Sequence, residues 1–162
     1  MTSTIEVLLA DYHNPRHAHD LGWLLNQYAR DPMGGGGALP GEITDKLASE
    51  LAKRPHAFSV LCYVDDQPAG LVNCFEGFST FIGRALVNIH DVVVVDNYRG
   101  LNVSQRMLEC VEEQARLRDC CKLTLEVLEG NRTAQGAYRK FGFAGYELEP
   151  EFGAALFWQK AL

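Results

Sequence analysis

The sequence predicts one domain of the α/β (α+β) class over residues 1–162, with a mixed, mostly antiparallel sheet and one parallel crossover. Three observations predict it. Short apolar runs separated by turn residues fill the middle of the chain, which is typical of antiparallel strands. Four valines at 92–95 are followed by a polar turn, a helical segment and another apolar run, which is the pattern of a parallel strand–helix–strand unit. A chain of 162 residues is long enough for one hydrophobic core.

The first third of the chain predicts one strand and two helices. Residues 5–9 form a short apolar run and predict the first strand. Asn14 before Pro15 is a typical helix start, and apolar residues recur at helical spacing through residue 30. Residues 31–37 contain a proline and four glycines, which indicates a loop: either a flap over a substrate or a plain linker. A second helix is predicted over residues 42–54, where Pro55 ends it.

The remaining elements follow from turns and periodicity. The valines at 92–95 are expected to be buried on both faces of the sheet, as in a central strand. The predicted elements are strands at 56–64, 69–78 and 85–95, a helix at 102–118, a strand at 122–128, a helix at 132–141 and a last strand at 153–160.

Composition excludes several classes of protein. The formal charge of −6 disfavours a nucleic-acid-binding surface, which needs clustered Lys and Arg. No apolar run has the length of a membrane span, and the N-terminal residues lack the basic region of a signal peptide. The five cysteines contain no C-x-x-C pair, so they predict reduced thiols, no metal site and a cytoplasmic protein.

The turn at Tyr98-Arg99-Gly100 is the most informative feature. It joins a valine-rich strand directly to a helix. The first N–H groups of a helix have no partner within the helix, and the helix dipole favours negative charge there. The turn therefore predicts a site for an anion, above all a phosphate.

Two motifs resemble the GNAT superfamily of acetyl-CoA-dependent N-acetyltransferases. The first is the stretch from Tyr98 to Leu108, which is similar to the family's pyrophosphate loop. The second is Asn131, Ala134 and Tyr138 followed by Gly142-Phe143, which matches the N-x-x-A-x-x-x-Y…G-F pattern. Each pattern alone is weak. The two patterns are separated by one predicted helix and one predicted strand, and in this arrangement they are specific together. Within the superfamily, residues 83–100 are similar to the spermidine/spermine and thialysine acetyltransferase branch.

The resemblance implies the GNAT fold, with the strands at 85–95 and 122–128 splayed apart at their C-terminal ends. It also implies acetyl-CoA as co-substrate, with pantetheine between these strands. Two positions of the loop that are usually small in the family hold Asn102 and Ser104; Asn tolerates left-handed backbone and Ser is small. The implied CoA-binding residues are Val92, Val93, Val94, Arg99, Gly100, Leu101, Asn102, Val103, Ser104, Gln105, Asn131 and Ala134.

Two side chains are candidates for acid–base catalysis. Tyr138 is the candidate general acid for the departing thiolate, and its alternative role is that of a core tyrosine. His90 is the candidate general base, and its alternatives are a packed strand histidine or an ordered water as the base. In a regular strand Asp91 faces away from His90, whereas a bulge changes which residue faces the site.

The sequence therefore predicts transfer of acetyl from acetyl-CoA to a primary amine by direct attack in a ternary complex. The acceptor stays open between a small amine, a polyamine, an amino acid and a peptide or protein amine. A CoA-binding domain without catalysis and a scaffold that has lost the cofactor are the alternatives. The resemblance also implies a homodimer, for which four aromatic residues are contact candidates: Phe78, Phe81, Phe152 and Phe157.

Overall fold

The computed structural model describes residues 3–146 and 149–162. The chain forms two compact units, Met1–Leu125 and Glu126–Leu162. Each unit is described by itself. In the described part of the chain, no helix is both long and apolar enough to cross a membrane.

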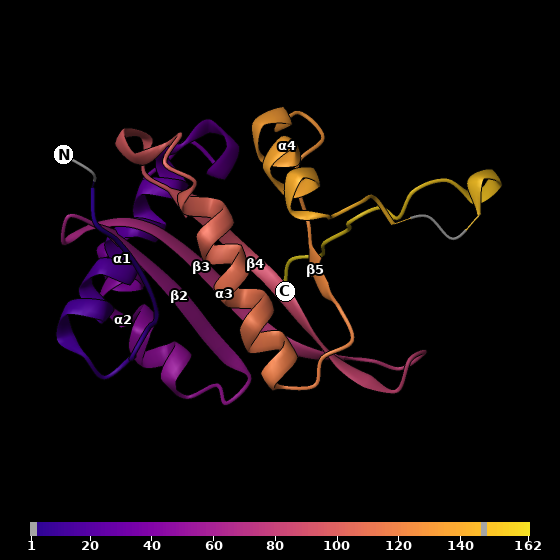
Figure 1. Cartoon of the computed structure of the whole chain (residues 1–162), viewed down its shortest axis with the longest axis horizontal. Helices are drawn as coiled ribbons and strands as arrows, with labels where there is room; N and C mark the ends of the chain where they lie inside the picture. The colour runs from indigo at the N-terminus through magenta and orange to yellow at the C-terminus, as the bar shows by residue number, and fades with distance from the viewer. Residues whose placement is uncertain (1–2, 147–148) are drawn as a thin grey trace. The chain divides into compact units, whose positions relative to one another are not determined.

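The first unit is built on one five-stranded sheet (Figure 1). The strands lie in chain order, and each neighbouring pair is antiparallel except β4 and β5, which are parallel. The predicted meander and parallel crossover are therefore confirmed. The strands are β1 (Ile5–Leu9), β2 (Ala57–Val64), β3 (Gln67–Ser79), β4 (Arg84–Val94) and β5 (Leu123–Leu125).

Helices cover both faces of this sheet, as Figure 1 shows for α3. Neighbouring residues of β3 show the two faces. Leu71 packs with Leu21 and Leu24 of the first helix in the main apolar cluster. Gly70 lies under α3 so closely that an added Cβ would be 2.7 Å from Met107 Cε. The helices of this unit are α1 (Pro15–Arg30), α2 (Gly41–Ala52) and α3 (Val103–Leu117), with short 3-10 helices η1 (Pro32–Gly34) and η2 (Asp96–Tyr98).

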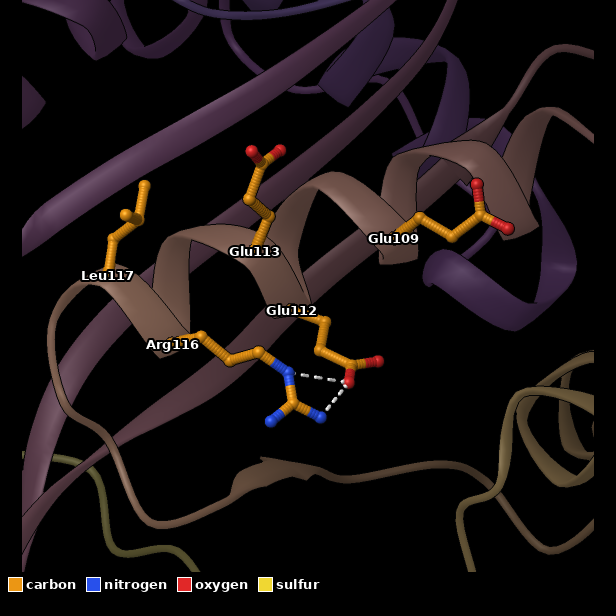
Figure 2. A pocket seen from close by; sticks show the side chains of 5 residues that line it. All are labelled: Glu109, Glu112, Glu113, Arg116 and Leu117. Atoms are coloured by element: carbon orange, nitrogen blue, oxygen red, sulfur yellow. Dashed lines mark hydrogen bonds and ion pairs between the residues drawn. The ribbon is translucent and has the colours of Figure 1, made fainter.

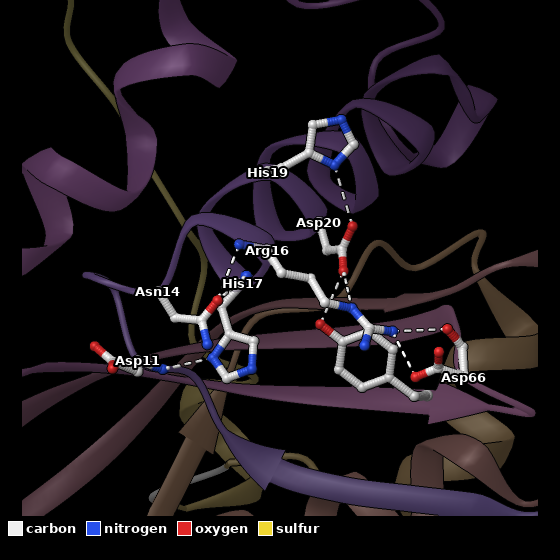
Figure 3. A network of polar contacts seen from close by, with 8 residues as sticks. Asp11, Asn14, Arg16, His17, His19, Asp20 and Asp66 are labelled. Atoms are coloured by element: carbon white, nitrogen blue, oxygen red, sulfur yellow. Dashed lines mark hydrogen bonds and ion pairs between the residues drawn. The ribbon is translucent and has the colours of Figure 1, made fainter.

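A polar network fixes α1 to the β2–β3 hairpin (Figure 3). Asp20 is buried within α1, and the hydroxyl of Tyr63 donates a hydrogen bond of 2.9 Å to its carboxylate. Arg16 lies over the Tyr63 ring and donates to the Asp66 carboxylate at 2.8 Å. A buried carboxylate is tolerated only when it has polar partners, and Asp20 has the Tyr63 hydroxyl and, at 3.6 Å, Arg16 Nε.

The valine run of β4 corrects one expectation. Val93 is buried, but Val92, Val94 and Val95 are only half-buried, so the run is not buried on both faces. The reason is the sheet edge: β5 pairs with β4 only as far as Ile89, so the valines beyond it have a strand neighbour in the first unit on one side only. The predicted strand at 122–128 is correspondingly shortened to three residues.

The second unit contains α4 (Arg132–Phe141) and the 3-10 helix η3 (Pro150–Phe152). Asn131 caps the start of α4, and Gly142 ends it in the left-handed conformation at φ 108°. The last strand predicted at 153–160 is wrong: among the described residues of this segment, only Ala154 has a bridge. Its apolar residues, including Phe157 and Trp158, do not alternate with polar ones, and both are more than 70% exposed (75% and 83%).

Candidate functional site

The outer edge of β4 is open beyond its midpoint. β4 pairs with β5 at Val87, Asn88 and Ile89, and no further pairing joins the two strands. On its other side, β4 continues to pair with β3 up to Val94. Within the first unit, the backbone groups on the outer side of residues 90–94 therefore have no strand partner. Such an edge can accept an extended ligand that carries amide groups.

A β-bulge lies where this edge begins. Cys74 of β3 opposes Ile89 and Asn73 opposes Asp91, so His90 is the extra residue of β4. The His90 ring contacts the ring of Phe75, with centroids 5.4 Å apart at 89°. Asn73 donates from Nδ2 to Asp91 Oδ2 at 3.0 Å.

The bulge brings His90 and Asp91 to the same side of the sheet. Their partners Phe75 and Asn73 are two residues apart on β3, and residues two apart on a strand share a face. This is the face covered by α1 and α2, because Phe75 packs against the cluster that contains Leu21 and Leu24. Of the two alternatives for this strand, β4 therefore has the bulge, and Asp91 does not face away from His90.

The loop after β4 has the backbone geometry of a tight turn into a helix. Gly100 has φ 86° and Asn102 has φ 60° and ψ 20°, both in the left-handed region. Asn102 immediately precedes α3, and its carbonyl accepts the N–H of Arg106 at 3.1 Å. Val103 is buried, whereas Leu101 is exposed and Ser104 is half-buried. The N-terminus of the 15-residue helix α3 therefore follows an exposed, left-handed residue.

Arg99 lies in this loop between two carboxylates. Its Nη2 is 2.8 Å from Asp96 Oδ1 and 3.5 Å from Asp31 Oδ2. Asp31 also accepts the N–H of Met33, so it caps η1 in the loop between α1 and α2. The glycine-rich segment and the β4–α3 loop are thus neighbours at the same end of the sheet.

The glycine-rich segment is folded back on α1. The N–H of Gly37 donates to the carbonyl of Ala29 at 3.0 Å. A Cβ added to Gly34 would lie 1.9 Å from the Tyr28 carbonyl oxygen, so this position requires glycine. These contacts are those of a structured turn rather than of a plain linker.

The second motif forms a helix with both ends defined. The Asn131 side chain accepts the N–H of Ala134 at 3.2 Å, which gives this asparagine a capping role at the start of α4. At the other end, Gly142 allows the chain to turn, and Phe143 returns to pack on Tyr138 with ring centroids 5.9 Å apart. The Gly-Phe pair of the motif therefore orients the tyrosine ring.

The predicted residues divide between the two units. The first unit holds His90, the open edge at Val92, Val93 and Val94, and the loop from Arg99 to Gln105; the second holds Asn131, Ala134 and Tyr138. Sequence reasoning missed the buried residues Asn73, which contacts Asp91, and Ser59, which contacts Asn73. Their signal was a lone polar residue in each of the apolar runs AFSVLCYV and GLVNCF.

The surface of α3 does not form a phosphate site. A shallow depression on α3 is lined by Glu109, Glu112 and Glu113 with Arg116 and Leu117, and Arg116 is paired with Glu112 (Figure 2). Three carboxylates repel an anion. No group of three or more metal-binding side chains is found in residues 3–146 and 149–162.

The buried cysteines are poor nucleophiles. Burial raises the pKa of the Cys62 thiol to about 11 and also raises that of Cys74. Because the thiolate is the reactive form, both side chains serve as packing groups.

Comparison with known proteins identifies the family of the chain. The family model described as the acetyltransferase (GNAT) family matches residues 11–143. A candidate ribosomal protein bS18-alanine N-acetyltransferase of Bacillus subtilis (strain 168) is 29% identical over 98 residues, which are 60% of this chain and 61% of that protein. The chain thus matches about three fifths of that relative's length.

Solved structures share the fold. The aminoglycoside N-acetyltransferase AAC(6')-Iy in complex with CoA superposes with a TM-score of 0.77 at 15% identity, covering 100% of this chain and 98% of that one. The ribosomal-protein-alanine N-acetyltransferase of Brucella melitensis biovar Abortus 2308 gives 0.70 at 19% identity, covering 98% of each chain. Because the family model matches residues 11–143, the chain belongs to the acetyltransferase (GNAT) family.

Proposed function

We propose that the protein transfers an acetyl group from acetyl-CoA to a primary amine by direct attack in a ternary complex. The observation that carries this proposal is the open edge of β4, which leads from the bulge at His90 into the left-handed loop at Asn102. One end of this path offers backbone groups for an amide-bearing arm. The other end offers a helix N-terminus for a phosphate.

The co-substrate is assigned along this path. Pantetheine carries two amides, which suit the backbone groups of Val92, Val93 and Val94. The pyrophosphate suits the loop from Arg99 to Gln105, where Gly100 and Asn102 already have the left-handed conformation of a tight anion-binding turn. Arg99 would exchange a carboxylate partner for a phosphate oxygen. Asn131 and Ala134 are assigned to CoA from their motif.

The reaction forms a carbon–nitrogen bond and breaks the carbon–sulfur bond of the thioester. The amine must lose a proton to attack, and we assign that proton to His90 or to a water held beside it. The departing thiolate must gain a proton, which we assign to the phenol of Tyr138. A backbone N–H of the open edge polarises the thioester carbonyl.

The acceptor is proposed to be a small-molecule amine. The loop with Asp31 at its start has no run of acidic residues for a polyamine, whereas the bulge presents His90 and Asp91 together on the face under α1. The second candidate is the N-terminal amine of a protein, because the Bacillus subtilis relative is a candidate ribosomal-protein-alanine N-acetyltransferase. The two differ in the size of the acceptor.

The test follows CoA-SH release from acetyl-CoA with a panel of aminoglycosides, alkylamines, amino acids and alanine-initiated peptides. Release with a small amine supports the first proposal, and release with the peptides alone supports the second. Binding of acetyl-CoA without release for any amine would contradict catalysis and favour a CoA-binding domain. Absence of binding would favour a scaffold that has lost the co-substrate.

Substitution then tests the roles of the side chains. Tyr138→Phe keeps the ring that packs on Phe143 and removes the proton donor, so we expect kcat to fall by about 10²–10⁴-fold with CoA affinity kept. For His90→Ala, we expect loss of the acidic limb of the pH–rate profile. Unchanged turnover in the first variant would remove Tyr138 from the mechanism, and an unchanged limb in the second would leave water as the base.

The homodimer also remains a proposal. Phe78 and Phe81 lie in the β3–β4 hairpin region and are 63% and 95% exposed, while Phe152 and Phe157 are exposed in the second unit. Sedimentation of wild type and Phe81→Ser tests it, and a monomeric wild type would contradict it.

A further inference from the structure

A continuous chain of side-chain hydrogen bonds crosses the sheet and ends at the bulge. The Tyr12 hydroxyl is 2.8 Å from Ser59 Oγ, and Ser59 Oγ is 2.6 Å from Asn73 Oδ1. Asn73 Nδ2 is 3.0 Å from Asp91 Oδ2. Ser59, Asn73 and Asp91 lie on the neighbouring strands β2, β3 and β4, and the register pairs them directly across the sheet.

All the hydrogen bonds of this chain point toward Asp91. Ser59 has one hydroxyl proton and donates it to the carbonyl oxygen of the Asn73 side chain, so the Ser59–Tyr12 contact must be donated by Tyr12. The amide of Asn73 then donates to the carboxylate. Burial raises the pKa of Tyr12, which keeps its phenol protonated as a donor. Hydrogen bonds that point the same way polarise and strengthen one another.

Stability of the sheet does not explain this chain. Ser59 and Asn73 are 1% and 4% exposed, and apart from Ser79 at the end of β3 the other buried residues of these two strands are apolar or aromatic. Replacing hydrogen-bonded partners by apolar groups of the same shape is close to neutral or stabilising, so a sheet of this kind has no need of buried polar groups. The chain does, however, fix one oxygen of a carboxylate at the start of the open edge of β4.

The charge of Asp91 is not balanced by a neighbouring cation. Within residues 3–146 and 149–162, no Lys, Arg or His forms an ion pair with Asp91, and only its Oδ2 accepts a side-chain hydrogen bond. Burial, and then the charges of Asp91 and Asp31, raise the pKa of the nearby Tyr28 phenol, so Tyr28 stays neutral. A half-buried carboxylate with one oxygen fixed and no cation beside it suits a cationic ligand.

We propose that Tyr12, Ser59 and Asn73 are positioning residues that orient the Asp91 carboxylate, and that Asp91 binds the ammonium group of the acceptor. This inference rests on the proposed function, because the ammonium is that of the amine to be acetylated. The bulge places Asp91 beside His90, which takes the proton once the amine is bound. The Asn73 amide is too weak an acid to pass protons along, so the chain orients the carboxylate and does not conduct protons.

A double-mutant cycle tests whether the chain acts through Asp91. Ser59→Ala breaks the chain at its centre, and we expect kcat/KM for the amine to fall about tenfold, the size of a lost buried hydrogen bond, with the KM for acetyl-CoA unchanged. Asp91→Asn keeps the shape and removes the charge, and it should raise the KM for the amine. In the Asp91→Asn background, Ser59→Ala should have no further effect on kcat/KM.

The matched control is Tyr63→Phe. It also removes a buried hydroxyl that donates to a carboxylate on the same face, but the carboxylate is Asp20 in α1. We expect it to lower stability and leave kcat/KM unchanged. Two results would overturn the proposal. One is that Ser59→Ala lowers kcat/KM equally in wild type and in the Asp91→Asn background; the other is that Tyr63→Phe lowers kcat/KM as much as Ser59→Ala does. If Ser59→Ala does not fold, Tyr12→Phe replaces it, with an expected fall of about threefold.

A binding readout separates failure of this inference from failure of the proposed function. If wild type binds acetyl-CoA but acetylates no amine, catalysis is contradicted. The side-chain amide resonances of Asn73 still decide the inference, because this amide donates directly to Asp91. Butylammonium should shift them in wild type, whereas neutral butan-1-ol should not, and Asp91→Asn should abolish the shift. Equal shifts with both compounds would overturn the proposal.

Discussion

Asn102→Ala offers a direct test of the pyrophosphate loop. Asn102 precedes α3 with φ 60° and ψ 20°, and its side chain makes no capping hydrogen bond. The left-handed backbone of Asn102 determines where the N–H groups of the first turn of α3 point. Alanine disfavours this conformation because its Cβ approaches the following carbonyl oxygen.

The size of the effect follows from backbone preferences. The left-handed conformation is about 1–2 kcal/mol less favourable than the right-handed one for a residue with a Cβ, but asparagine occupies it several times more often than most residues do. A preference of about three- to fivefold corresponds to roughly 0.6–1 kcal/mol. If CoA binds only the left-handed state, Asn102→Ala should raise its Kd by about three- to fivefold. Asn102→Gly should bind CoA at least as tightly as wild type.

Calorimetric titration with CoA measures the Kd, and thermal unfolding without ligand measures stability. The matched control is Asp119→Ala, because Asp119 is also left-handed, at φ 55°, just beyond the other end of α3. Its ion pair with Arg84 is on the surface and contributes little. Asp119→Ala should lower Tm by about 2–4 °C, and Asn102→Ala should lower it less, because a loop that leaves the left-handed conformation in the free protein loses CoA affinity instead of stability. Only the Asn102 variant should weaken CoA binding.

Two results would refute this reasoning. The first is an Asn102→Ala variant with the Kd of wild type and a lowered Tm, since the left-handed conformation would then matter for folding but not for the ligand. The second is an Asp119→Ala variant that weakens CoA binding equally, since the effect would then be general to α3.

Three further predictions concern stability. Gly22→Ala should lower the free energy of unfolding by about 1–2 kcal/mol in urea titrations, because its Cβ would lie 2.6 Å from the Thr44 carbonyl oxygen; Gly41→Ala, with no atom within 4 Å, should be neutral. Asn131→Ala should lower the free energy of unfolding by about 1 kcal/mol, because it removes the cap of α4. Asn131→Asp keeps a capping oxygen and should have the wild-type value in the same titrations. The raised pKa of Cys62, about 11, stabilises the fold below the ordinary thiol pKa, and this contribution is lost between about pH 9 and 11; thermal unfolding should show a smaller alkaline loss in Cys62→Ala.

The parts of the fold that could be predicted accurately are those defined by local signals. The helices at Pro15–Arg30 and Arg132–Phe141 have the predicted bounds at both ends. Each begins after an asparagine whose side chain accepts backbone N–H groups of the first turn. Such caps depend on residues within one turn of each other, so the sequence contains all the information that they need.

The parts that could not be predicted depend on pairing between distant segments. The run at 122–128 has the composition of a longer strand, but only Leu123–Leu125 pairs, and it pairs with residues of β4 far earlier in the chain. Whether the segment at 153–160 forms a strand depends in the same way on a partner, and apolar composition alone does not supply one. The prediction that the valines of β4 are buried on both faces was wrong for the same reason.

The residues of the candidate site show how one inserted residue changes the chemistry that a sheet presents. In a regular strand, His90 and Asp91 face opposite sides, and a base and a carboxylate cannot act on the same amine. The bulge adds one residue opposite Asn73 and Cys74, and both side chains then face α1. Only the pairing of β3 with β4 contains this information. Ser59 and Asn73 are polar residues within apolar runs, and this pattern in the sequence indicates that the face has a role besides core packing.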